Sequence, residues 1–119
     1  MNFDLSELDA VFDALANHHR REIVYLLGLQ PCSISYLAQV RNLSLPAIHK
    51  HIRILEAAGM ITRRKIGQTN VLTLNRQSLC VLQDWVAQYH PYWGSEEETL
   101  ENYAHYLGKR RNENIEEKP

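Results

Sequence analysis

The chain has 119 residues, 45% of them hydrophobic, and a formal net charge of −1 at pH 7. This length suits one small domain, and the apolar share is sufficient for a hydrophobic core without disulfides. Because no apolar run reaches the roughly 18 residues of a membrane span, we expect none. A nearly neutral charge does not by itself favour nucleic acid, so the distribution of charge matters more than its sum.

The amino-terminal segment is acidic and amphipathic, without the basic start and apolar run of a secretory signal. We therefore expect a cytoplasmic protein. The two cysteines, Cys32 and Cys80, are too few and too far apart in the sequence for a disulfide framework, so ordinary reduced thiols are expected. A redox switch between them is the alternative, if the fold brings them together.

Charge is distributed unevenly along the chain. Between residues 41 and 65 there are six basic side chains and one acidic side chain, Glu56, whereas the first seventeen residues carry four acids and no base. Residues 94–119 hold seven acids and four bases. A basic middle between acidic ends predicts a protein that binds DNA through a local surface.

The first half of the chain is predicted to form four helices. Apolar residues recur in it at helical spacing, and polar residues that can cap free backbone N–H groups precede the last three helices. The third and fourth are joined by a three-residue turn, as in a helix-turn-helix motif, although any helical hairpin can imitate this pattern. The predicted helices span residues 4–16, 18–29, 34–40 and 44–58.

The helix at 44–58 has a marked start and a marked end. Ser44 can cap its first turn, Pro46 is tolerated there, and Gly59 supplies a stop. One side of the helix is an apolar stripe that is expected to pack inward. The stripe comprises Ile48, Ile52 and Leu55.

The opposite face carries small, polar or cationic side chains, as a helix needs if it is to enter the DNA major groove. His49, Lys50 and Arg53 are the candidate base readers, and Ala47 is small enough to contact a thymine methyl group. Ser44 and the first-turn N–H groups can hold a phosphate. For the cations, a solvated helix face is the alternative.

Two short β-prone runs follow at 60–66 and 70–74, with Gly67 and Gln68 between them as a two-residue turn. A helix-turn-helix followed by such a hairpin is a winged helix. Three cations beside the hairpin tip would neutralise phosphates or enter the minor groove, although a solvated edge strand is the alternative. These cations are Arg63, Arg64 and Lys65.

A longer helical pattern begins near Gln77, and its apolar stripe is broader than one small domain needs. We therefore expect a twofold dimer whose interface uses this surplus. Ser95 and Glu98 form a capping box for a last helix. We expect one DNA-binding and dimerisation domain at residues 1–108. The charged segment 109–119 that follows is expected to be disordered. The predicted interface comprises Leu8, Val11, Phe12, Leu79, Leu82, Trp85, Val86, Tyr89 and Trp93.

Several motifs together resemble a known family. They are Phe12-Asp13-Ala14-Leu15-Ala16-Asn17, Arg20-Arg21-Glu22-Ile23, the run from Leu43 to Ile61, Arg63-Arg64-Lys65, Trp85-Val86-Ala87-Gln88-Tyr89 and Tyr92-Trp93. With these motifs the chain resembles the ArsR/SmtB family of small winged-helix repressors, in the branch with a Trp- and Tyr-rich final helix. The resemblance implies a homodimer formed by the first and long C-terminal helices, and a small-molecule effector, not identified, that controls DNA release.

The usual metal ligands of that family are not in place. Its metal sensors carry a Cys-x-Cys pair in the third helix, where this chain has Ser33 and Ser35. The ligand set of the long helix is also missing, because Asp84 is followed two places later by Val86. We therefore expect no metal and no cofactor. In the wing, Gln68 stands where the family usually has arginine.

The histidines support two interpretations. His51 lies toward the apolar stripe, so a packed, hydrogen-bonded ring is favoured over base contact. His18 and His19 start a helix and are expected to lie solvated on different faces. A metal site that also uses His90 and His105 is the alternative.

The sequence has no Gly-rich phosphate loop, nucleophile elbow or ordered acid/base pair, so we expect no enzyme. The predicted protein is mainly α-helical with a small β-hairpin, a winged helix-turn-helix homodimer that represses transcription at a near-palindromic operator. The alternatives are a thiol-redox- or metal-responsive sensor of the same fold and a protein-interaction module without DNA binding. The predicted DNA-binding residues are Ser44, Pro46, Ala47, His49, Lys50, Arg53, Arg63, Arg64, Lys65 and Gln68.

Overall fold

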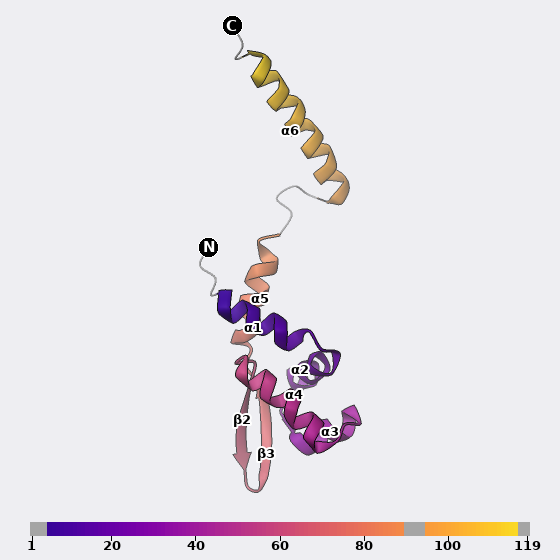
Figure 1. The fold of residues 1–119 in the computed structure, drawn as a ribbon, viewed down its shortest axis with the longest axis vertical. Helices are drawn as coiled ribbons and strands as arrows, with labels where there is room; N and C mark the ends of the chain where they lie inside the picture. Colours follow the sequence, from indigo (N-terminus) through magenta and orange to yellow (C-terminus); the bar gives the residue numbers. More distant parts are fainter. Residues whose placement is uncertain (1–4, 90–94, 117–119) are drawn as a thin grey trace. The chain divides into compact units, whose positions relative to one another are not determined.

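A computed structural model describes residues 5–89 and 95–116, which form two units that divide after Val86 (Figure 1). The described residues are mainly helical, with one small antiparallel sheet, as predicted. None of the described helices has the length and apolar character that crossing a bilayer requires. In chain order the elements are α1 (Leu5–Leu15), α2 (His18–Leu29), β1 (Cys32–Ser33), α3 (Ile34–Arg41), α4 (Leu45–Ala57), β2 (Ile61–Ile66), β3 (Thr69–Leu74), α5 (Gln77–Ala87) and α6 (Glu96–Glu116).

The predicted caps start the helices. The Asn17 side chain accepts from the backbone N–H groups of the second and third residues of α2, at 2.9 and 3.3 Å. Ser33 accepts from a first-turn N–H of α3 at 3.1 Å, and Ser44 does so for α4 at 3.3 Å. Each hydroxyl or amide therefore satisfies donors that the helix itself leaves free.

The helix-turn-helix depends on a left-handed residue that the sequence pattern did not indicate. Asn42 has φ 54° and ends α3, and its backbone N–H bonds back to the carbonyls of Ala38 and Gln39. Asparagine tolerates this conformation better than most residues. At the end of α4, Gly59 takes the same role with φ 73°, as predicted from the sequence.

The hairpin forms with the predicted turn, and a third strand joins it. Ile66 pairs with Thr69, so Gly67, with φ 63°, and Gln68 make the two-residue connection. The strand order is β1-β3-β2, all antiparallel. β1 was not predicted, because two residues are too few to show a periodic pattern. It pairs with the middle of β3 and joins the wing to the start of α3.

The core of the first unit is built around α4. Ile48, Ile52 and Leu55 have no exposed surface, as the predicted stripe requires. β2 lies against this helix, while β3 lies against α2 and α3. The other buried residues of the cluster are Val11, Ala14, Ile23, Leu27, Cys32, Ile34, Leu37, Ala38, Met60, Ile61 and Leu72.

Two features of the carboxyl-terminal part of the chain were not predicted from the sequence. α6 continues to Glu116, so the described part of 109–119 is helical and not disordered. Its start has the predicted capping box, with Ser95 and Glu98 bonded reciprocally at 3.2 and 3.3 Å, and good helix formers follow without proline. The first unit ends at Val86, earlier than the predicted boundary at 108, and the assignment of 87–108 to the same domain stays a prediction.

Burial of the α4 stripe makes a direct prediction about stability. Leu55→Ala removes a side chain with no exposed surface and should lower the free energy of unfolding by about 2–5 kcal/mol. Leu45→Ala, the same change at a 53% exposed position of the same helix, is the matched control and should change it by less than about 1 kcal/mol. Urea unfolding followed by circular dichroism measures both. Equal losses would contradict the packing described here.

Candidate nucleic-acid interface

The predicted base readers lie together on the outer face of α4. Pro46, Lys50 and Arg53 are exposed, while Ala47 and His49 are half-buried. The spacing of three and four residues between them keeps their side chains on neighbouring turns. Because the opposite stripe is buried in the core, this face can only point away from it.

A groove joins the start of α4 to the tip of the wing. It has a volume of about 230 Å³. His49 from the predicted helix face and Gln68 from the predicted wing tip share it. The sequence had shown no relation between these two positions, because the hairpin brings them together. The lining residues are Ile34, Ser35, Leu45, His49, Gln68, Thr69 and Asn70.

Three polar residues of this groove were not predicted: Ser35, Thr69 and Asn70. Asn70 is the cross-strand partner of Lys65, so the ladder register places it beside a predicted wing cation. Counting the strand pairs outward from the Gly67 turn would have placed Asn70 opposite Lys65, and so would have indicated it as a residue of this surface. Nothing in the sequence would have indicated Ser35, because its place at the groove depends on how α3 packs against β3.

The wing cations do not act as one group. Successive side chains of a strand point to opposite faces, so Arg63 and Lys65 share a face with buried Ile61, while Arg64 points to the other side. Arg63 Nη2 lies 2.7 Å from Glu56 Oε1, and both side chains are about a third exposed. All three cations are exposed, and Arg63 is in addition paired with Glu56 of α4.

The histidines form a cluster that the sequence only partly predicted. His51 is half-buried and its Nδ1 lies 3.3 Å from Arg20 Nη1, so the packed, hydrogen-bonded ring is confirmed. His18 is exposed, as expected, whereas His19 is half-buried. The expectation that they lie on different faces was wrong, because their rings lie 4.1 Å apart, and the His19 ring also lies 5.6 Å from that of His51. Arg41 Nη2 is 3.0 Å from His19 Nδ1. Folding of α2 against α4 brings these rings together.

The surroundings of His51 and His19 favour the neutral form of these two rings. Burial lowers the pKa of His51, and the positive charge of Arg20 lowers it further, with smaller contributions from His19, Lys50 and His18. Burial also lowers the pKa of His19, followed by the charges of His18 and Arg41. Both rings can therefore accept hydrogen bonds at neutral pH.

The structure gives little support to a metal or thiol sensor. Within the described ranges, no three His, Cys, Asp or Glu side chains are grouped so that they could hold a metal ion, and His90 lies outside those ranges. Cys32 is buried, its Sγ donates to the Gln30 carbonyl oxygen at 3.4 Å, and burial raises the pKa of its thiol. The raised pKa leaves less of the reactive thiolate. Cys80 is exposed.

The predicted dimer residues divide into buried and exposed ones. Leu8 and Val11 are buried within a single chain, which corrects their assignment to the interface. They were assigned because the sequence does not tell which part of an apolar helix face its own core covers. Leu79 and Leu82 pack against the core, and Trp93 lies outside the described residues. Phe12, Val86 and Tyr89 are 38%, 54% and 68% exposed.

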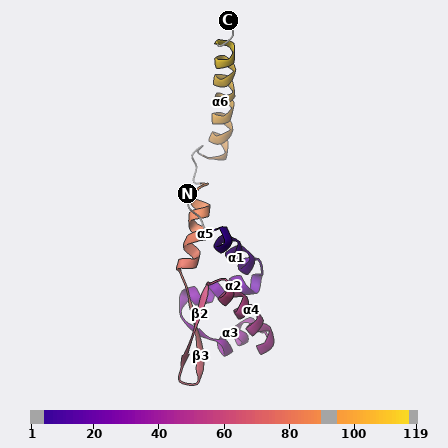
Figure 2. The same cartoon turned by 60° about the vertical axis from the view of Figure 1, so that its left-hand side comes forward.

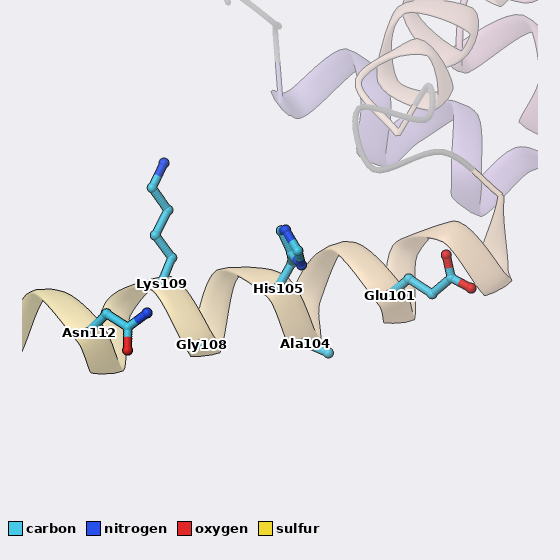
Figure 3. Close-up of a pocket in the computed structure, with 6 residues that line it drawn as sticks. All are labelled: Glu101, Ala104, His105, Gly108, Lys109 and Asn112. Atoms are coloured by element: carbon cyan, nitrogen blue, oxygen red, sulfur yellow. The ribbon is translucent and has the colours of Figure 1, made fainter.

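A larger hollow lies along α6 in the second unit (Figure 3). All of its lining residues come from this one helix, and Figure 3 shows Lys109 and His105 standing out from the helix without converging on a common point. A binding site needs polar groups that converge, so this hollow does not carry one. Its lining residues are Glu101, Ala104, His105, Gly108, Lys109 and Asn112.

Comparisons with known proteins agree with this geometry. The model of the family described as bacterial regulatory protein, arsR family, matches residues 17–63, which include α2 to α4. A helix-turn-helix-type transcriptional regulator of Mycobacterium tuberculosis is 32% identical over 75 residues, covering 63% of this chain and 70% of that protein. The chain belongs to the ArsR family. It is therefore a transcriptional regulator, and its winged helix is a DNA-binding element.

Solved structures of ArsR-family proteins share the fold. The crystal structure of an ArsR family transcriptional regulator superposes with a TM-score of 0.71 and 29% identity, over 81% of this chain and 99% of that one. The homodimeric winged helix-turn-helix domain of a Mycobacterium bovis protein superposes with a TM-score of 0.59 and 18% identity, over 77% and 90%. In this fold α4 is the recognition helix and β2–β3 is the wing.

The Glu56–Arg63 pair predicts a change in DNA affinity. Glu56→Gln removes an acidic charge beside the recognition helix and releases Arg63 for phosphate contact, so binding to a random duplex at low salt should tighten by about 2–10-fold. Unfolding free energy should change by less than about 1 kcal/mol, since the pair is partly exposed. The matched control is Glu22→Gln, the same change at an exposed position of α2. Fluorescence anisotropy would measure binding, and an equal gain in both variants would contradict release of Arg63.

Proposed function

We propose that this ArsR-family regulator is a homodimeric repressor that binds a near-palindromic operator and blocks a promoter. The observation that carries the proposal is the groove shared by His49 of the recognition helix and Gln68 of the wing tip. It supports a surface on which one helix reads bases while the wing contacts the adjacent backbone. Short polar and cationic side chains near a helix N-terminus are the usual readers of the major groove.

We assign different roles to the cations of this surface. Lys50 and Arg53 lie exposed on α4 and would contact bases or the phosphates that border the groove. Arg64 and Lys65 are exposed on opposite faces of β2 and would contribute affinity through phosphates. Ser44 already caps α4, so its contribution to phosphate binding would come from the free N–H groups of the first turn.

The dimer proposal rests on α1 and α5. Phe12 and Trp85 contact edge to face, with ring centres 5.1 Å apart, and Phe12 and Val86 leave apolar surface exposed beside this contact. In the first unit, α1 and α5 lie at the end opposite the hairpin tip (Figures 1 and 2). Pairing through them would leave both recognition helices free for half-sites about one DNA turn, or a multiple of it, apart.

DNA binding itself is tested by a gel shift with DNA from upstream of the protein's own gene, titrated with salt. If Lys50 contacts a phosphate, Lys50→Ala should reduce the slope of log affinity against log salt by about one. An unchanged slope with altered sequence preference would instead make Lys50 a base reader. If the wild-type protein does not distinguish this DNA from random duplex, a distant operator or a protein-interaction module would be favoured.

Dimerisation is tested by placing a charge on the exposed surface of α5. Val86→Asp should produce a monomer at micromolar concentration, because an unpaired carboxylate would be buried in the interface. Val40→Asp on α3, where the valine is 45% exposed, makes the same change elsewhere and should leave the dimer intact. Sedimentation velocity measures both. A wild-type protein that sediments as a stable monomer would refute the homodimer.

A further inference from the structure

We infer that Arg20 and His51 form a proton-sensitive latch that holds the recognition helix against the end of α1, so that DNA binding weakens when His51 takes up a proton. This inference rests on the DNA-binding function of the winged helix and adds a regulatory input to it. Arg20 and His51 are positioning residues here, because they act through the placement of α4.

The guanidinium of Arg20 connects three helices. Its Nε donates to the Ala14 carbonyl oxygen at 2.6 Å, and its Nη2 donates to the Asp13 carbonyl oxygen at 3.2 Å. These carbonyls belong to the last turn of α1, where a helix leaves its acceptors unsatisfied. The remaining arm, Nη1, lies 3.3 Å from His51 Nδ1 on α4. One side chain of α2 therefore ties the end of α1 to the recognition helix.

The contact with His51 requires a neutral ring. A guanidinium has only donors, so Nδ1 of His51 must carry a lone pair, with the ring proton on Nε2. A proton on Nδ1 would replace the acceptor with a second donor and place an imidazolium against the guanidinium. The latch is thus closed in one protonation state of His51 and broken in the other.

Among the described residues, only basic side chains are found to act electrostatically on His51. The side chains that act electrostatically on His51 are Arg20 and the neighbouring His18 and His19 of α2, together with Lys50 of α4. All of them are basic. From α1, Asp13 contributes its backbone carbonyl to Arg20, and on α4 the carboxylate of Glu56 is paired with Arg63.

A parallel bond at α3 has the same requirement. Arg41, in the last turn of α3, places Nη2 3.0 Å from His19 Nδ1, so His19 must also be unprotonated there. Its ring lies 5.6 Å from that of His51. Protonation within this cluster would therefore loosen α2 from both helices of the helix-turn-helix.

The sign of the effect separates the latch from direct contact with DNA. A histidine that touches phosphate gains positive charge on acidification and strengthens DNA binding. The latch predicts weaker binding instead. If DNA binds only the form with neutral His51, affinity falls by up to about tenfold for each pH unit below the pKa of that ring.

Stability should change in the same direction. Because the folded pKa of His51 lies below the unfolded value of 6.5, the unfolded chain binds the proton first as the pH falls. The stabilisation is complete above pH 6.5 and is lost progressively below it, down to the folded pKa. The pH dependence of unfolding is thus a readout that needs no DNA.

The test compares the full-length wild type with His51→Asn and His51→Leu. In His51→Asn, the amide oxygen can lie near the position of Nδ1, and the side chain cannot take up a proton. The DNA affinity of this variant at about pH 8 should therefore stay within about threefold of wild type. Its loss of binding toward about pH 5.5 should be clearly smaller than that of the wild type, with the bond between Arg41 and His19 left as the remaining proton-sensitive contact. His51→Leu removes the acceptor, so this variant should bind DNA weakly at every pH. His105→Asn, at an exposed position of α6, is the control and should retain the acid-dependent loss.

The probe is DNA from upstream of the protein's own gene, with a scrambled duplex alongside, at constant ionic strength. Circular dichroism at each pH checks that each protein is folded, and binding is compared only at pH values where it is. An acid-dependent loss as large in His51→Asn as in the wild type, or tighter wild-type binding in acid, would overturn the latch. If the wild type binds neither duplex, the proposed function fails, and the latch is judged by urea unfolding. The acid-dependent loss of stability must then be smaller in His51→Asn, and an identical loss would overturn it.

Discussion

The burial of one stripe on α4 is the constraint on which the rest of this structure depends. Ile48, Ile52 and Leu55 have no exposed surface, so the helix has one rotational setting that keeps them in the core. That setting leaves Lys50 and Arg53 at the surface, where their charges remain hydrated. Packing of the apolar stripe thereby presents these cations to a polyanion.

Polar interactions at the two ends and on the inner side of α4 further fix the position of this helix. Glu56 holds Arg63 of the wing against the recognition helix, and the groove at His49 brings the hairpin tip to the start of the same helix. On the inner side, Arg20 connects α1 and α4 through the Ala14 carbonyl oxygen and His51 Nδ1. The helix that reads DNA is thus positioned by a nonpolar core and oriented further by a small set of charge-assisted bonds. Such bonds respond to protonation, whereas the core does not.

Signals within a few residues of the sequence were sufficient to predict most of the helices and strands. The caps at Asn17, Ser33 and Ser44, the Gly59 stop and the Gly67 turn all occur where the sequence places them. Each one reflects chemistry within a few residues: a side chain that satisfies a free N–H, or a glycine at a positive φ. The buried stripe of α4 was equally readable, because helical spacing decides which residues share a face.

What the sequence determined by itself is therefore the order of the helices and of the two hairpin strands, the DNA-binding motif and the candidate readers on α4. The tertiary structure alone decided which distant groups meet: His49 with the wing tip, Arg63 with Glu56, and Arg20 with His51. It also showed that Val11 is covered by its own chain. The physical reason is that capping and periodicity act along the chain, whereas these contacts join residues on separate elements, whose distances are set by packing.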